Sequence, residues 1–102
     1  MKEERILIVE DDVNISENIE EILQLLGYVN IDIANSANQA IKVVKKYRPD
    51  MVFMDIKLKG DKDGIELGEI IQQMVDAPIV YVTSYSDPAI IERAKRTHPA
   101  GF

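Results

Sequence analysis

Hydrophobic residues in this chain follow two patterns, one typical of strands and one typical of helices. Three short runs are apolar at every position and a fourth segment alternates apolar and polar residues, which predicts strands at 6–9, 29–33, 51–54 and 79–82. Between them, apolar residues recur at steps of three and four. This spacing predicts helices from Asn14 to Gly27, from Ser36 to Arg48, and through Leu67, Ile70, Ile71 and Met74. A further helix is expected to start at Ser86-Asp87-Pro88.

Strands that alternate with helices indicate a parallel sheet covered by helices on both faces, which is the α/β class. The chain has 102 residues, a length that suits one domain spanning 1–102. In a doubly wound sheet the first, third and fourth strands lie side by side. The carboxyl ends of these strands would therefore meet at one edge, which is where open α/β sheets bind ligands.

Composition excludes several classes of function. There is no cysteine, so disulfides and thiolate metal sites are ruled out. The net charge is −6, and nucleic-acid binding by this domain is not expected because it needs a basic face. No apolar stretch approaches the roughly 18 residues of a membrane span. The charged start, Met1 to Arg5, does not resemble a signal peptide. We expect a cytoplasmic protein.

Each apolar run stops at a group suited to phosphate chemistry: Glu10-Asp11-Asp12, then Asp55, then Thr83-Ser84. Taken singly, such residues are commonly helix caps or turn formers. Taken together, Asp11, Asp12 and Asp55 would converge. Two unit charges about 4 Å apart repel by roughly 4 kcal/mol at an effective dielectric near 20. We therefore expect a proton or a divalent cation among them, and Mg²⁺ fits best because it prefers oxygen ligands.

The same segments carry a resemblance to a known family. Four motifs resemble the receiver domain of two-component response regulators, in the right order and along the whole chain: Ile6 to Asp12, Met54-Asp55-Ile56, Asp63 to Leu67, and Val82-Thr83-Ser84. The resemblance implies a five-stranded flavodoxin-like fold, a doubly wound parallel sheet of strand order 2-1-3-4-5. It also implies phosphorelay signalling, in which a sensor histidine kinase or a phosphotransfer protein gives a phosphoryl group to an aspartate.

The resemblance further assigns roles to residues of the metal site. Asp55 matches the phosphoacceptor. Asp11 and Asp12 match the acidic pair that binds Mg²⁺, with Asp12 as a direct ligand and Asp11 acting largely through water. The backbone carbonyl of Lys57 matches the position that completes the metal site.

Two more residues match the conformational switch of the family. Thr83 matches the hydroxyl residue that bonds to the acyl phosphate, and Phe102 falls on the aromatic position that turns inward when the hydroxyl moves. On this view the domain is not an enzyme beyond its own phosphorylation and dephosphorylation.

The sequence departs from the family at its end. The fifth strand, its lysine and the fifth helix would lie beyond Phe102, so we expect a shortened domain. An exposed edge at 79–82 would then favour a homodimer. The loop from Leu58 to Gly64 is also longer than usual and lacks proline.

Two other functions stay open. A pseudo-receiver would act as a docking module without phosphorylation. An aspartate-nucleophile phosphohydrolase is disfavoured, since such enzymes usually have a second acid where this chain has Lys57.

Overall fold

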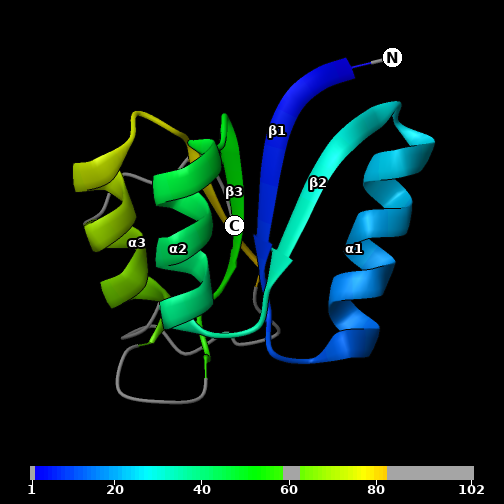
Figure 1. Cartoon of the computed structure of the whole chain (residues 1–102). Helices are drawn as coiled ribbons and strands as arrows, with labels where there is room; N and C mark the ends of the chain where they lie inside the picture. Colours follow the sequence, from blue (N-terminus) through cyan, green and yellow to red (C-terminus); the bar gives the residue numbers. More distant parts are fainter. Residues whose placement is uncertain (1, 59–62, 83–102) are drawn as a thin grey trace.

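The computed structural model describes residues 2–58 and 63–82. The elements follow one another as β1 (Lys2–Val9), α1 (Val13–Leu25), β2 (Tyr28–Ala34), α2 (Ala37–Tyr47), β3 (Met51–Asp55), α3 (Gly64–Met74) and β4 (Ile79–Val82). All strand pairs are parallel and the sheet order is β2-β1-β3-β4. The doubly wound, flavodoxin-like α/β fold with strand order 2-1-3-4 is therefore confirmed (Figure 1).

The register brings the strand ends to one level. Val9 pairs with Met54 across β1 and β3, and Asp55 pairs with Val82 across β3 and β4. The residues that follow β1, β3 and β4 consequently meet at the carboxyl edge of the sheet. This geometry comes from parallel pairing without a shift along these two strand pairs.

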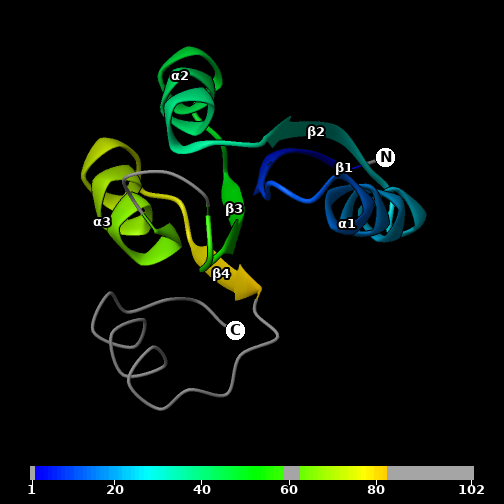
Figure 2. The ribbon, with the colours of Figure 1, turned by 90° about the horizontal axis from the view of Figure 1, so that it is seen from below.

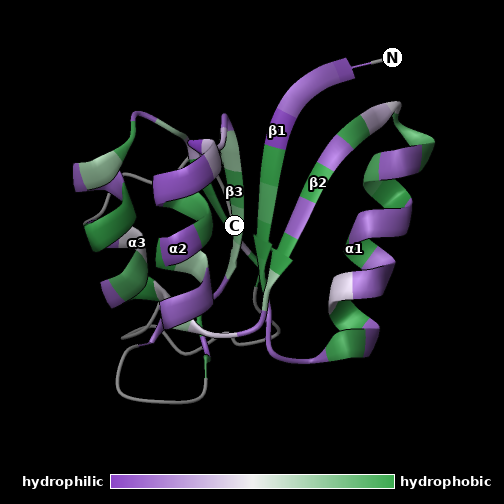
Figure 3. Cartoon of the chain, in the orientation of Figure 1, coloured by the Kyte–Doolittle hydropathy of each residue, from purple (hydrophilic) through white to green (hydrophobic). Residues whose placement is uncertain are grey.

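Helices cover both faces of the sheet, with α1 on one face and α2 and α3 on the other (Figure 2). Alternate side chains of each strand point to opposite faces. Leu7 and Val9 therefore join the larger core under α2 and α3, whereas Ile6 and Ile8 join a smaller one under α1. The carboxyl half of β1 is hydrophobic and its amino half is hydrophilic (Figure 3).

The ends of the helices agree with their capping residues, with one correction. The first helix begins at Val13 and is capped by Asp12, so the predicted start at Asn14, as the capping residue, is wrong. The Asp12 side chain accepts hydrogen bonds from the backbone amides of Asn14 and Ile15 in the first turn, which is the role of an N-cap residue. The second helix starts after Ser36 and ends at Tyr47, as predicted.

The outer side of α1 keeps an apolar stripe. Ile15, Ile22 and Leu26 are exposed among the described residues, beside the buried Leu23. No helix among residues 2–58 and 63–82 is long and apolar enough to cross a membrane. The expected fourth helix, the end of the chain, Thr83 and Phe102 lie outside the described residues. The homodimer through the edge at 79–82 stays a prediction.

Candidate metal centre at the carboxyl edge of the sheet

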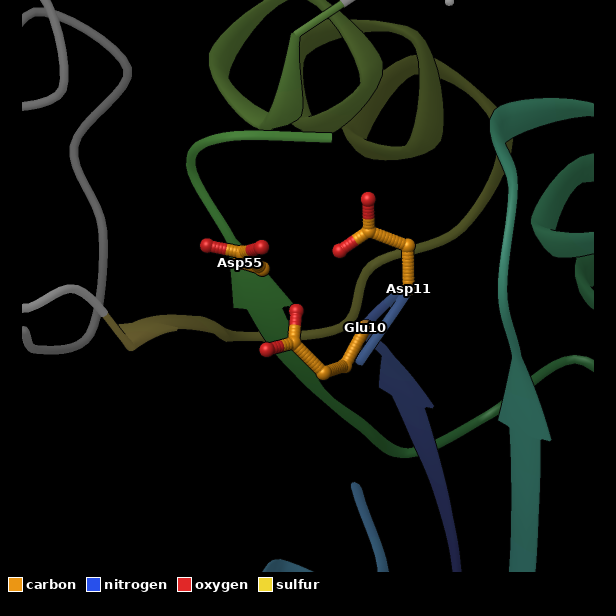
Figure 4. A group of neighbouring side chains, drawn as sticks. All are labelled: Glu10, Asp11 and Asp55. Atoms are coloured by element: carbon orange, nitrogen blue, oxygen red, sulfur yellow. The ribbon is translucent and has the colours of Figure 1, made fainter. Parts of the chain in front are cut away.

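Three carboxylates meet where β1 and β3 end. One oxygen from each of Glu10, Asp11 and Asp55 lies within 4.8 Å of the others. Asp55 is the last residue of β3, and Glu10 and Asp11 directly follow β1. Figure 4 shows the Asp11 carboxylate turned toward Asp55, while Glu10 reaches from the end of β1 toward β3. The sheet register thus creates the cluster, because Val9 and Met54 are paired immediately before it.

Backbone hydrogen bonds fix two of the three residues. The Glu10 amide donates to the Ala34 carbonyl at 3.0 Å, which extends the pairing of β1 with β2 by one residue. The Asp55 Oδ1 atom accepts a hydrogen bond from the Lys57 amide at 3.1 Å. This bond orients the Asp55 carboxylate at the edge of the sheet, where it is half-buried.

Glu10 has the most perturbed environment of the three. Its side chain is 5% exposed, and its Oε2 atom is buried without a hydrogen-bond partner among the described residues. The pKa of Glu10 is raised from 4.5 to about 8, most of all by burial, and also by a side-chain hydrogen bond to Asp55 and by the charges of Asp55 and Asp11. A hydrogen bond between two carboxyl groups requires a proton on one of them. Glu10 therefore holds a proton next to Asp55 when no cation is bound.

The group has the composition of a site for a hard cation. Three carboxylates offer only oxygen ligands, which suit Mg²⁺ better than softer metals. Asp11 and Asp55 are half-buried and keep access to solvent, which Mg²⁺ needs because it retains several waters. The buried, unpartnered Oε2 of Glu10 is an acceptor that a cation or a proton would satisfy.

The structure brings together some of the predicted site residues. Asp11 and Asp55 lie in the cluster, as expected from the sequence. Asp12 lies outside it: the side chain is exposed, and Oδ1 accepts from the amides of Asn14 at 2.9 Å and Ile15 at 3.3 Å. Asp12 therefore serves α1 as its N-cap in this structure. Its role as a metal ligand stays a prediction.

The backbone amide of Lys57 donates the hydrogen bond that orients Asp55. The contribution of its carbonyl to a metal site stays a prediction, as do the switch roles of Thr83 and Phe102. Sequence reasoning missed Glu10 as a member of the cluster. The signal was its position, because Glu10 directly follows the run Ile6 to Val9 as Asp55 directly follows Met51 to Met54.

A glycine sets the approach of α3 to the same edge. The Gly64 amide donates to the Ile56 carbonyl at 2.7 Å, and Asp63 caps the helix by accepting from the Glu66 amide at 2.9 Å. A Cβ atom at position 64 would overlap the Asp55 carbonyl oxygen and would lie 2.7 Å from its carbon. Only glycine lets α3 begin directly against the backbone of Asp55.

Comparisons with curated proteins give relatives along most of the chain. Sporulation initiation phosphotransferase F of Bacillus subtilis (strain 168) is 35% identical over 97 residues, which cover 93% of this chain and 76% of the relative. Transcriptional regulatory protein PdtaR of Mycobacterium tuberculosis is 34% identical over 91 residues, which cover 89% of this chain. The chain spans 44% of the length of PdtaR.

Solved structures share the fold over nearly the whole chain. The signal receiver domain of a modulated diguanylate cyclase from Desulfovibrio desulfuricans G20 aligns with a TM-score of 0.90 at 31% identity and covers 98% of this chain and 79% of that structure. A CheY-like receiver domain protein from Methanospirillum hungatei JF-1 aligns with a TM-score of 0.87 at 27% identity, with coverage of 98% and 79%. The sequence model of the response regulator receiver domain matches residues 6–102. The chain therefore belongs to the response regulator receiver domain family, whose members act in two-component signalling.

Proposed function

We propose that Asp55 accepts a phosphoryl group from a phosphohistidine of a sensor histidine kinase or a phosphotransfer protein, in a reaction that needs Mg²⁺. The observation that carries this proposal is the convergence of Glu10, Asp11 and Asp55 within 4.8 Å at the carboxyl edge of the sheet. Receiver domains interact with such kinases and phosphotransfer proteins. Asp11 and Asp55 would hold the cation, with Glu10 beside them.

Asp55 acts as the nucleophile. One of its carboxylate oxygens attacks phosphorus, an oxygen–phosphorus bond forms, and the nitrogen–phosphorus bond to the donor histidine breaks. The product is an acyl phosphate on Asp55. Because Oδ1 is held by the Lys57 amide at 3.1 Å, the carboxylate has a fixed orientation before the donor arrives. Positioning of this kind supplies much of the rate in phosphoryl transfer.

The surrounding acids control the charge that the incoming phosphoryl group meets. When bound, Mg²⁺ offsets the repulsion between an anionic nucleophile and an anionic donor and stabilises the charge on the equatorial oxygens. With no cation present, the pKa of Glu10, raised to about 8, favours its protonated form at neutral pH. This proton lowers the negative charge beside Asp55.

The output of phosphorylation is proposed to pass through β4. An acyl phosphate adds roughly −1.5 to −2 charges at Asp55. Asp55 pairs with Val82 at the end of β4, which supports Thr83, the next residue, as the hydroxyl that bonds to the phosphoryl group. The inward turn of Phe102 would follow this movement and relay it to a partner.

The proposal is tested by incubating the protein with acetyl phosphate, with and without Mg²⁺, and measuring its intact mass. We expect one added phosphoryl group, only with Mg²⁺, and none in Asp55→Asn. That substitution keeps the shape of the side chain but removes the nucleophilic charge. Asp76→Asn is the matched control, because Asp76 is an exposed carboxylate after α3 and its loss should leave the reaction unchanged.

The same assay separates the two other functions. If wild type gains no phosphoryl group with Mg²⁺ present, the proposal is wrong and a docking module is favoured. If acetyl phosphate is consumed over many turnovers far faster than the acyl phosphate accumulates, a phosphohydrolase is favoured.

A further inference from the structure

A glycine and a tyrosine fit together between α3 and β4. Tyr81 lies in β4 and is fully buried. A Cβ atom at Gly68 would overlap the Tyr81 hydroxyl, and it would lie 3.3 Å from Tyr81 Cζ and 3.5 Å from Ile79 Cδ1. The tyrosine ring therefore occupies the space that any other residue at position 68 would fill.

Gly68 shares a face of α3 with Gly64, since residues four apart lie one above the other on a helix. At Gly64 the helix rests on the backbone of Asp55 and Ile56, where a Cβ atom would lie 2.8 Å from Ile56 Cα. At Gly68 it rests on Tyr81. One face of α3 thus contacts the phosphoacceptor at one turn and β4 at the next.

The two contacts are also joined through the sheet. Met54 pairs with Tyr81, and Asp55 pairs with Val82. The side chains of Met54 and Tyr81 lie in the core under α2 and α3. A closed loop of contacts results, from Asp55 through Gly64 and α3 to Tyr81, and back through β4 to Asp55.

We propose that Tyr81 is a positioning residue for phosphorylation: its ring, seated on Gly68, sets the distance of α3 from β4 and so the position in which Gly64 holds Asp55. The proposal rests on the function proposed above for Asp55. Tyr81 acts through α3 and does not touch the phosphoryl group. Because the ring is fully buried, it cannot swing into solvent when the spacing changes. Close-packed interiors transmit such a displacement to their neighbours.

Two substitutions change this spacing in opposite directions. Gly68→Ala adds a methyl group against the tyrosine and pushes α3 away from β4. Tyr81→Leu removes the far half of the ring and lets α3 settle closer. Each should displace Gly64 and Asp55, and a misplacement on the order of 1 Å costs about 10-fold to 100-fold in rate. Gly68→Ala combined with Tyr81→Phe removes the atom that clashes and should restore most of the rate.

The experiment measures acyl-phosphate formation from acetyl phosphate at saturating Mg²⁺, together with the amide resonances of Asp55 and Gly64 by NMR. Gly68→Ala and Tyr81→Leu should react at least about 10-fold more slowly and shift both resonances. Val44→Ala is the stability control, because Val44 is fully buried in α2 and lies outside this loop of contacts. It should lower the urea midpoint without changing the rate or those two resonances.

The readouts distinguish this proposal from the proposed function. A wild type that takes no phosphoryl group contradicts the function, and the resonances of Asp55 and Gly64 still decide whether Tyr81 positions them. A wild-type rate and unshifted resonances in folded Gly68→Ala or Tyr81→Leu would overturn the positioning role. If Gly68→Ala does not fold, the rates and resonances of Tyr81→Leu and of the double variant decide whether Tyr81 has the positioning role. A double variant that folds but reacts as slowly as Tyr81→Leu also counts against it.

Discussion

Replacing Glu10 by glutamine should change how the stability of the domain depends on pH. The Glu10 carboxyl lies against Asp55 and Asp11, is 5% exposed, and has a pKa raised from 4.5 to about 8. Between pH 4.5 and about pH 8, the folded state therefore keeps a proton on Glu10 that the unfolded state has released. Stability from this group is fully present below pH 4.5 and is lost as pH rises through about 8.

The size of the change in stability follows from the interval between the pKa values of Glu10 in the unfolded and folded states. At about 1.36 kcal/mol for each pKa unit, ionisation of Glu10 in the unfolded state lowers stability by on the order of 3 kcal/mol at pH 7, relative to acid conditions. Glutamine resembles the protonated carboxyl, since its amide donates a hydrogen bond and carries no charge. Glu10→Gln should therefore differ from wild type by about 1 kcal/mol near pH 5 and by about 3 kcal/mol near pH 7, with the variant the more stable.

Urea unfolding in EDTA at a series of pH values between 4.5 and 8 measures this difference. Glu21→Gln is the matched control, because Glu21 is exposed on α1, and its difference from wild type should not grow with pH. Saturating Mg²⁺ should narrow the gap for Glu10→Gln, because the cation offsets the charge that destabilises wild type. Parallel stability curves for wild type and Glu10→Gln over this range would refute the reasoning about the buried carboxyl.

Four further substitutions test other parts of the structure. Asp11→Ala should abolish Mg²⁺-dependent phosphorylation, and an unchanged gain in intact mass would contradict this. Asp12→Ala should lower the free energy of unfolding by about 1 kcal/mol through the lost helix cap, and its gain in intact mass with Mg²⁺ tests the ligand role that the resemblance implies. Gly64→Ala should lower the free energy of unfolding by about 3 kcal/mol through overpacking and should slow phosphorylation. A variant with wild-type stability and the wild-type rate would contradict the contact with Asp55. Arg48→Gly should raise stability by roughly 0.5–1 kcal/mol, since Arg48 has φ 49° after α2 and glycine has no left-handed penalty; a lower urea midpoint would count against that strain.

Local patterns were sufficient to predict the sheet and the position of Asp55. The run Met51 to Met54 is apolar on both faces, which is typical of a central strand, and β3 does lie between β1 and β4. A polar residue directly after such a strand has to lie at the carboxyl edge. Asp11 is the second residue after β1, and the strand order predicted that it would converge with Asp55 at this edge.

The place of Glu10 in the cluster depended on detail that the sequence pattern lacks. Glu10, Asp11 and Asp12 are consecutive acids, so the hydrophobic pattern before them does not say which of the three lies opposite Asp55. Pairing of Val9 with Met54 settles which acid lies opposite Asp55, and the first turn of α1 takes Asp12 as its cap. Both are tertiary facts, and local propensity gives no access to them.

The contacts of Gly64 and Gly68 were likewise outside the reach of the sequence. Each glycine is defined by what it touches, which is the backbone of Asp55 in one case and the ring of Tyr81 in the other. The partners are 9 and 13 positions away along the chain. Periodicity identified the buried side of α3 through Leu67 and Ile71, but it carries no information on how closely the helix approaches the sheet.

The central claim is that Asp55 is the residue that receives the phosphoryl group. Treatment of the acetyl phosphate-reacted protein with borohydride reduces an acyl phosphate to homoserine, and peptide mass spectrometry then locates the reduced residue. We predict homoserine at position 55 alone, and only when Mg²⁺ was present during the reaction. Homoserine at another acidic position, or a stable phosphoryl group on the single histidine, His98, would contradict the account.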